Sequence, residues 1–442
     1  MNTLRTRDIF ALGFMTFALF VGAGNIIFPP FIGLQAGHNV WLAAAGFLIT
    51  GVTLPVITIV AMAKVGGSMA KLTQPIGKTA GIILTVVCYL AIGPLFAGPR
   101  TATVSFEIGL LPFLKENSIE HYKNYALFIY SLIYFLIVIA ISLHPGKLLD
   151  TVGHVLAPLK IIALAILGIA AFIYPAGDIG HATKVYEVSA FSQGFVNGYL
   201  TMDTLASLAF GIVIINAIRS RGIESTKLLT RYAVIAGIIA GIGLALVYIS
   251  LFKLGSNSSS VAMDADNGAV VLHQYVNFTF GEFGAIFLGI LIGIACLVTA
   301  IGVTTACGAY FSTILPIPYR AIILGIATFS FIISNIGLTQ LIKISEPVLI
   351  AIYPPCIVLV MMSFFKKFWH FPHYVFSPVM LVSLIFGIFD GLKTAKISIP
   401  EWFIHLPLAD KSLAWLIPSL IVLVIATVVD QLLAKRMAYK IE

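Results

Sequence analysis

The chain has 442 residues, of which 60% are hydrophobic and only 10% are charged. A soluble globular protein is nearer half apolar and a quarter charged, so separate soluble domains, intrinsic disorder and a coiled coil are excluded. The apolar residues suffice for about 12 membrane-spanning helices of roughly 20 residues each. The net charge of +8 comes from basic residues in short loops between apolar runs. This distribution is typical of membrane topology rather than of nucleic-acid binding.

Continuous apolar runs, without the alternation of an outer-membrane barrel, predict an all-α polytopic membrane protein formed by one domain, 1–442. The first run extends to about residue 35, beyond the length of a signal-peptide core, so we expect a retained first helix. A polar insert at 254–282 is expected to be a loop with at most a short helix. The predicted spans are 9–35, 40–63, 79–112, 124–143, 153–175, 193–218, 229–253, 283–310, 320–336, 339–364, 373–391 and 412–433.

The basic residues predict the orientation of these spans. Sixteen of the 26 Lys and Arg residues fall in one set of alternate loops and eight in the other. Loops rich in Lys and Arg stay in the cytoplasm. The richer set includes both terminal segments, so we expect both termini to be cytoplasmic.

Two predicted spans contain breaks at membrane depth. Span 1 carries Gly22, Gly24 and Asn25, and span 6 carries Gly198 close to Asp203. Because these spans are five apart, a duplicated five-span unit would enter the membrane in opposite orientations. Interrupted helices at matching places in two inverted halves indicate the binding site of a secondary transporter. For a single Gly-rich stretch, close helix packing is the alternative.

A broken helix leaves free N–H groups where one half starts and free carbonyls where the other half ends. The half-helix that starts near Asn25 can therefore hold a carboxylate. The carbonyls around Ala18 and Val21 can ligate a cation. Together they predict a site for an anion-bearing substrate beside a cation, and an amino acid fits this description.

Span 8 offers further oxygen ligands for an alkali cation. The hydroxyls of Thr304 and Thr305 follow the Ile301 carbonyl by one turn. The alternative is that each threonine bonds the carbonyl four residues before it, which is common in membrane helices.

Ionisable residues inside spans are functional candidates by default. Asp203 lies in the span 6 break, where a structural hydrogen bond to freed N–H groups is the alternative. Arg100 and Glu107, two turns apart on one helix face, can pair with other groups in a gate. Arg100 could instead reach the membrane interface if its span ends nearby.

Three other ionisable residues are expected nearer the span ends. Glu346 is a further gating or coupling candidate, with a local pair to Lys343 near the outer surface as the alternative. Lys160 and Asp390 are close enough to the ends of their spans to be interfacial. Neither CxxC nor HExxH occurs, so no metal centre other than a coupling-ion site is predicted.

Three sequence blocks are similar to those of the bacterial branched-chain amino acid:cation symporter family. They are Leu19–Pro30, Gly98–Ala102 with Ser105–Glu107, and Gly198–Ala206. The resemblance covers nearly the whole chain. It implies the leucine-transporter-like fold, with about 12 transmembrane helices in two inverted five-helix repeats, broken helices 1 and 6, and two additional helices. The repeats would be 9–175 and 193–364, and the additional helices 373–433.

The resemblance also implies the site residues. The substrate-binding residues would be Gly22, Ala23, Gly24, Asn25, Tyr199, Thr201, Met202 and Asp203. The sodium ligands would be Ala18, Val21, Ile301, Thr304 and Thr305. Several superfamily members carry a small neutral polar residue where this chain has Asp203. That carboxylate could bind the substrate ammonium or titrate, which leaves sodium, a proton or both open. Phe20, Phe106 and Phe210 are candidates for the apolar pocket.

The expected function is sodium-coupled import of L-leucine, L-isoleucine and L-valine by alternating access across the bacterial inner membrane. Proton coupling and a broader neutral amino acid specificity are the alternatives. A channel would favour symmetric pore-lining segments from several subunits, and an intramembrane enzyme would need a metal motif or a Ser/His or Asp pair. We expect no enzymatic activity and no cofactor beyond the coupling ion. The expected partners are the substrate and the lipid bilayer, without nucleic acid.

Overall fold

The computed structural model describes residues 4–114, 116–143 and 148–438, and its regular structure throughout these ranges is helical. Helices dominate because lipid cannot hydrogen-bond backbone groups, so an apolar segment satisfies them internally. The basic residues Lys115, Lys147 and Lys440 lie outside the described residues. The helices are α1 Thr6–Phe20, α2 Ala23–Ala36, α3 Val40–Leu48, α4 Leu54–Lys64, α5 Met69–Leu72, α6 Lys78–Leu90, α7 Ala97–Gly109, α8 Glu116–Ser142, α9 Leu148–Ile173, α10 Lys184–Asn197, α11 Asp203–Arg219, α12 Thr226–Ser256, α13 Gly268–Ile314, α14 Tyr319–Ser334, α15 Leu338–Ser363, α16 Pro372–Thr394, α17 Glu401–Ile404 and α18 Leu416–Ala438.

Within the described ranges, nine helical stretches are long and apolar enough to cross a membrane, and two shorter apolar stretches, Lys160–Ile173 within α9 and Tyr319–Ser334 (α14), accompany them. The predicted polar insert is shorter than expected. α12 continues to Ser256 and α13 already begins at Gly268. α13 bends at Gly281, whose φ of 69° is a left-handed conformation that glycine adopts without a steric penalty.

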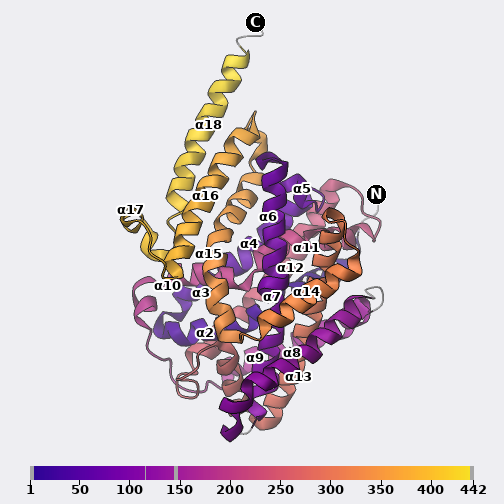
Figure 1. Cartoon of the computed structure of the whole chain (residues 1–442), viewed down its shortest axis with the longest axis vertical. Helices are drawn as coiled ribbons and strands as arrows, with labels where there is room; N and C mark the ends of the chain where they lie inside the picture. Colours follow the sequence, from indigo (N-terminus) through magenta and orange to yellow (C-terminus); the bar gives the residue numbers. More distant parts are fainter. Residues whose placement is uncertain (1–3, 115, 144–147, 439–442) are drawn as a thin grey trace.

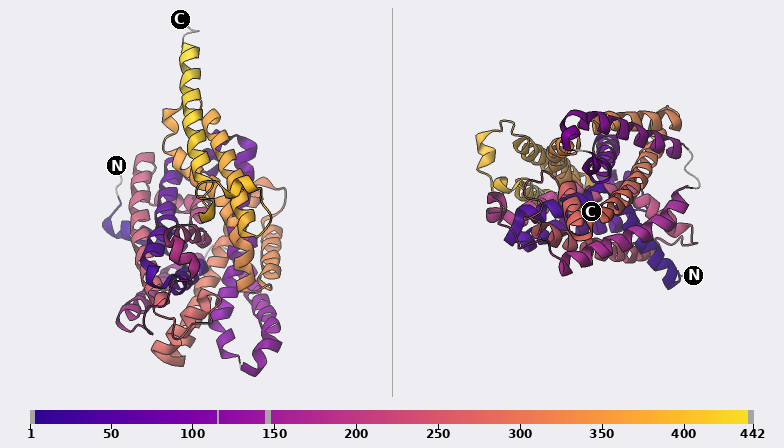
Figure 2. Two further views of the ribbon diagram at one scale, coloured as in Figure 1. Left: turned by 90° about the vertical axis from the view of Figure 1, so that its left-hand side faces the viewer. Right: turned by 90° about the horizontal axis from the view of Figure 1, so that it is seen from below.

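One face of α12 packs against α1, α2, α4 and α9. On one side of the molecule, α16 lies between α15 and α18, and the C-terminal end of α18 projects beyond the rest of the bundle (Figures 1 and 2). α13 packs along α7 and α2. This arrangement brings the ends of α1, α2 and α11 together in the interior.

The outside of the bundle is strongly apolar. Large side chains on α12 and α18 are exposed, including Ile242 (58%), Leu246 (62%) and Val424 (64%). Apolar surface of this extent is not stable against water and marks a surface that contacts lipid. The fold is therefore membrane-embedded.

Candidate functional site at the helix breaks

The first break lies between α1 and α2, at the position predicted from the sequence. Val21 and Gly22 are extended, and the helix resumes at Ala23. The Gly22 amide donates to Asn25 Oδ1 at 2.9 Å, so the Asn25 side chain caps the new helix. The break thus exposes carbonyls on the α1 side and amides on the α2 side.

The second break separates α10 from α11. A 3₁₀ turn, η6 (Gly198–Thr201), is followed by Met202 in the left-handed region with φ 62°. A Cβ on Gly198 would lie 2.0 Å from Thr50 Oγ1, so only glycine fits this approach. Asp203 then occupies the first turn of α11, where the positive end of the helix favours a carboxylate.

A hydrogen-bond network joins the two breaks. Asn25 Nδ2 donates to Asp203 Oδ2 at 2.7 Å and also to the Tyr248 hydroxyl. The Tyr248 hydroxyl, on α12, donates to the same Asp203 oxygen at 2.9 Å. All three residues are buried. The two breaks are therefore held in one fixed geometry by a polar cluster inside the bundle.

A cavity of about 50 Å³ lies between the breaks. Seven of the eight residues predicted to bind substrate line it: Gly22, Ala23, Gly24, Asn25, Thr201, Met202 and Asp203. Its remaining wall is largely apolar and includes Phe20, Ile92, Phe210 and Val303. A cavity lined by both polar and apolar groups suits a small molecule with a charged end and an apolar side chain.

Two predicted residues do not reach this cavity. The Tyr199 ring is fully buried and stacks on Tyr353 with ring centroids 4.5 Å apart. Phe106 instead packs against Tyr130, 5.6 Å between ring centroids. Neighbouring residues of the short turn η6 point to different sides. The Tyr199 side chain therefore points away from the cavity that Thr201 lines.

Arg100 is positioned by a third break that the sequence analysis missed. Span 3 is interrupted at Gly93, which has φ −90° and ψ −113°, and α7 begins only at Ala97. Arg100 is therefore in the first turns of α7, fully buried, and lines the cavity. It does not reach the membrane interface. Its Nη1 donates to the Leu200 carbonyl at 2.6 Å, and its Nη2 donates to Ser345 Oγ at 2.9 Å.

A larger vestibule of about 460 Å³ adjoins the cavity, between α2, α10, α15 and the segment 266–268. Leu200 and Phe28 line the vestibule, and both contact the Arg100 guanidinium, whose central carbon lies 5.0 Å from the Phe28 ring centroid. Arg100 thus lies at the boundary between the two spaces. Glu346 and Lys343 also line the vestibule, but no ion pair joins them in the described ranges.

The third gating candidate, Glu107, lies elsewhere on α7. Its carboxylate is 3.6 Å from the ammonium of Lys123 on α8. The Glu107 side chain is buried, whereas that of Lys123 is 43% exposed. Glu107 and Arg100 share a helix, but the structure pairs each with different residues.

Lys160 occupies an unexpected position. It is buried rather than interfacial, and its Nζ donates to the Val21 carbonyl. The Lys160 ammonium thus binds a carbonyl that was predicted to be a sodium ligand.

Asp390 was also expected near the end of its span. It is fully buried, and its carboxylate accepts a hydrogen bond from the Ala414 amide at 3.0 Å.

The predicted threonine ligands lie on other faces of α13. Thr305 Oγ1 donates to the Ile301 carbonyl at 2.5 Å, as the alternative interpretation expected. Ile301 packs in a cluster with α7 and α8. Thr299 and Val303 line the cavity instead, and a Cβ on Gly22 would lie 3.5 Å from Thr299 Cγ2. The helical period of 3.6 residues places Thr304 and Thr305 away from that face.

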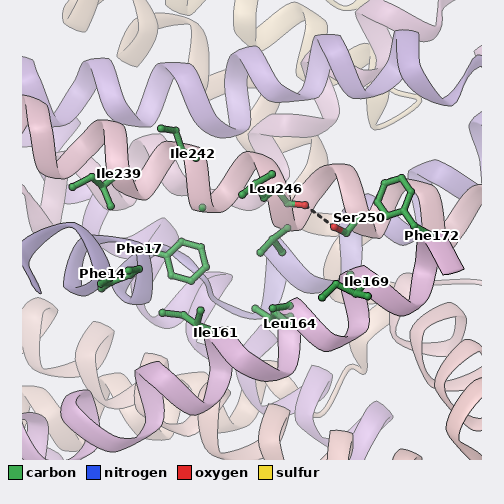
Figure 3. A pocket seen from close by; sticks show the side chains of 14 residues that line it. Phe14, Phe17, Ile161, Leu164, Ile169, Phe172, Ile239, Ile242, Leu246 and Ser250 are labelled. Carbon is green, nitrogen blue, oxygen red and sulfur yellow. Dashed lines mark hydrogen bonds between the residues drawn. The ribbon is translucent and has the colours of Figure 1, made fainter. Parts of the chain in front are cut away.

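A second large hollow lies away from the breaks. A groove of about 510 Å³ opens on the outside of the bundle between α1, α9 and α12 (Figure 3). Its side chains are apolar except Ser250, whose hydroxyl donates to the Leu246 carbonyl of its own helix. The groove provides no group that could bind a charged substrate.

Sequence reasoning missed three residues of the site: Tyr248, Ser345 and Thr299. Each is a hydroxyl-bearing residue inside an apolar run, which is a weak signal because membrane helices commonly contain such residues. The described residues contain no cluster of three or more His, Cys, Asp or Glu side chains that could hold a metal ion.

The chain is similar to known transport proteins over nearly its whole length. A family model described as "Branched-chain amino acid transport protein" matches residues 5–433. The chain is 63% identical over 437 residues to the branched-chain amino acid transport system 3 carrier protein of Pseudomonas aeruginosa, covering 98% of this chain and 99% of that protein. It is 58% identical over 432 residues to the branched-chain amino acid permease BrnQ of Escherichia coli K12, covering 97% of each.

Among solved structures, MhsT in complex with L-phenylalanine matches with a TM-score of 0.53 at 16% identity, covering 94% of this chain and 98% of that one. At this identity the match bears on the fold alone. The named relatives are carriers and permeases rather than enzymes. The chain belongs to the family of branched-chain amino acid transport proteins.

Proposed function

We propose that the protein imports L-leucine, L-isoleucine and L-valine across the bacterial inner membrane together with a cation, by alternating access. The observation that carries this proposal is the cavity between the two helix breaks, which is lined by the charged residues Arg100 and Asp203 together with apolar residues. The names of the relatives support the substrate class. In this proposal the transporter has twelve spans. They form two inverted repeats, 9–175 and 193–364, followed by two additional helices in 373–433.

The driving ion has two candidates. Sodium would use the carbonyls of Ala18, Val21 and Ile301 with the hydroxyls of Thr304 and Thr305. The Thr305 hydroxyl can donate to the Ile301 carbonyl and still offer a lone pair to the ion. A sodium ion at the Val21 carbonyl would lie next to the Lys160 ammonium, so Lys160 would have to move or lose its proton.

The Lys160–Val21 contact favours the second candidate, a proton. A protonated lysine presents a positive charge to the carbonyls that end α1, which is the role of a bound cation. Loss of the proton would weaken that contact and release the break.

Uptake into proteoliposomes tests transport and the driving ion together. Purified protein should accumulate labelled leucine against its gradient only when a cation gradient is imposed. Uptake driven by a pH gradient in sodium-free buffer, and lost in Lys160→Met, would identify the proton. Uptake that needs sodium and survives in Lys160→Met would identify sodium. Equilibration without accumulation under every gradient would contradict symport and indicate a channel or facilitator.

Labelling of introduced cysteines tests the orientation. Met263, in the segment between α12 and α13, is 79% exposed. In intact cells, an impermeant thiol reagent should label Met263→Cys from outside but not Arg221→Cys. The reverse pattern would contradict cytoplasmic termini.

A further inference from the structure

Two oppositely charged side chains line the same cavity without an ionic partner. Arg100 is 0% exposed and Asp203 is 2% exposed. In the ranges 4–114, 116–143 and 148–438, neither forms an ion pair. A buried, unpaired charge is strongly unfavourable, so a protein keeps one only where a ligand or function compensates for it.

Arg100 also has an unused donor. Its two hydrogen bonds go to neutral acceptors, the Leu200 carbonyl and the Ser345 hydroxyl. Its Nε is buried with no hydrogen-bond partner. A guanidinium carries five N–H donors in a planar fork that matches a carboxylate. The geometry therefore leaves both charge and hydrogen-bonding capacity for an anion.

The start of α2 lies directly against this guanidinium. A Cβ on Gly24 would be 3.4 Å from Arg100 Nη1 and 3.4 Å from the Leu200 carbonyl oxygen. The positive end of α2 and the Arg100 side chain thus act on the same small volume. Both favour a negative group there.

Asp203 provides the opposite charge at the other break. The side chains of Asn25 and Tyr248 both donate to its Oδ2. A carboxylate has two oxygens with about four acceptor sites, so Asp203 can accept a further donor. A substrate ammonium would supply one and neutralise the buried charge.

We propose that Arg100 binds the carboxylate of the substrate and that Asp203 binds its ammonium. This inference rests on the proposed function and deepens it, because it specifies an α-amino acid recognised at both charged groups. Each half of the zwitterion compensates one buried charge of the protein. Compounds with only one of the two charges, such as amino acid amides or free acids, leave a buried charge unpaired and bind weakly.

A gate without ligand contact is the competing role for Arg100, since it lies at the boundary with the vestibule. A gate would affect every ligand alike. A carboxylate ligand affects only compounds that carry a carboxylate. The two roles are therefore separated by a ratio of affinities rather than by loss of transport.

The test measures equilibrium binding to the purified full-length protein by competition against labelled L-leucine. The competitors are L-leucine, L-leucinamide, which lacks the carboxylate charge, and 4-methylpentanoate, which lacks the ammonium. In Arg100→Gln, leucine affinity should fall roughly 10- to 150-fold, the range for hydrogen bonds to charged groups. Leucinamide affinity should change by less than about twofold. In Asp203→Asn, affinity should fall for leucine but not for 4-methylpentanoate.

Matched variants control for folding. Arg320→Gln makes the same substitution at an exposed arginine and should leave both affinities unchanged. Arg100→Lys keeps a buried cation if Arg100→Gln fails to fold, and it should lose part of the preference for leucine over leucinamide. An equal loss for leucine and leucinamide in both Arg100 variants, or no loss for either ligand, would overturn the proposal. A wild-type protein that binds no leucine would instead contradict the proposed function.

Discussion

The cavity at the helix breaks and the groove on the outside of the bundle differ in almost every respect. The groove measures about 510 Å³ and the cavity about 50 Å³. The groove is lined by apolar side chains that reach the surface, whereas the cavity contains buried Arg100 and Asp203. A zwitterion needs charged partners and not space alone, which is why we propose the smaller hollow as the substrate site. In a membrane protein, buried charge identifies a site better than volume does.

The largest expected effect comes from filling the cavity at the first break. A Cβ on Gly24 would already lie 3.3 Å from Phe28 Cε2 and 3.4 Å from Arg100 Nη1. In Gly24→Leu, the larger side chain would occupy the space next to the start of α2, so leucine binding should be lost. Equilibrium binding measures the loss of leucine affinity, and thermal unfolding in detergent measures whether the variant is still folded.

The matched control is Gly325→Leu on α14, where a Cβ would meet no atom within 4 Å. This variant should keep wild-type leucine affinity. Near-normal affinity in Gly24→Leu would show that the first break is not the substrate site.

An intermediate effect is expected from the network that joins the breaks. Tyr248→Phe removes one donor to the buried Asp203 carboxylate. Hydrogen bonds to charged groups contribute about 1.5–3 kcal/mol, so leucine affinity should fall by roughly tenfold or more. Tyr232→Phe, on the same helix but bonded to the Leu4 amide, is the control and should bind normally. Equal leucine affinity in the wild type, Tyr248→Phe and Tyr232→Phe would show that the network takes no part in substrate binding.

The smallest effect is expected in the groove. Leu246 is 62% exposed and faces it. Leu246→Ala should change leucine affinity less than about twofold, because truncation at an exposed site creates no buried cavity. A loss as large as that of Tyr248→Phe would mean that the groove takes part in binding.

The sequence analysis predicted the first two breaks but missed the third, at Gly93–Pro94, although glycine and proline occur there too. Glycine clusters and prolines act on the local backbone, and the placement of Gly22–Asn25 and of Asp203 depends mainly on neighbours in the chain. Seven of the eight residues predicted to bind substrate accordingly line the cavity.

The cation ligands depended on information that the sequence does not contain. Which face of α13 meets α1 is set by packing, and a rotation by one residue moves a side chain by about 100°. Thr299 therefore faces the break, although its hydroxyl, like that of Thr305, donates to the carbonyl four residues before it in α13. Lys160 was expected at the interface because depth was judged from span ends, whereas the structure brings it to the Val21 carbonyl.

A structure of the protein with bound L-leucine, determined by electron cryomicroscopy in a lipid nanodisc, tests the central claim most directly. The account predicts leucine density between the two breaks, with its carboxylate near Arg100 and Gly24 and its ammonium near Asp203. Leucine density confined to the outer groove or to the vestibule, with the cavity unchanged, would contradict it.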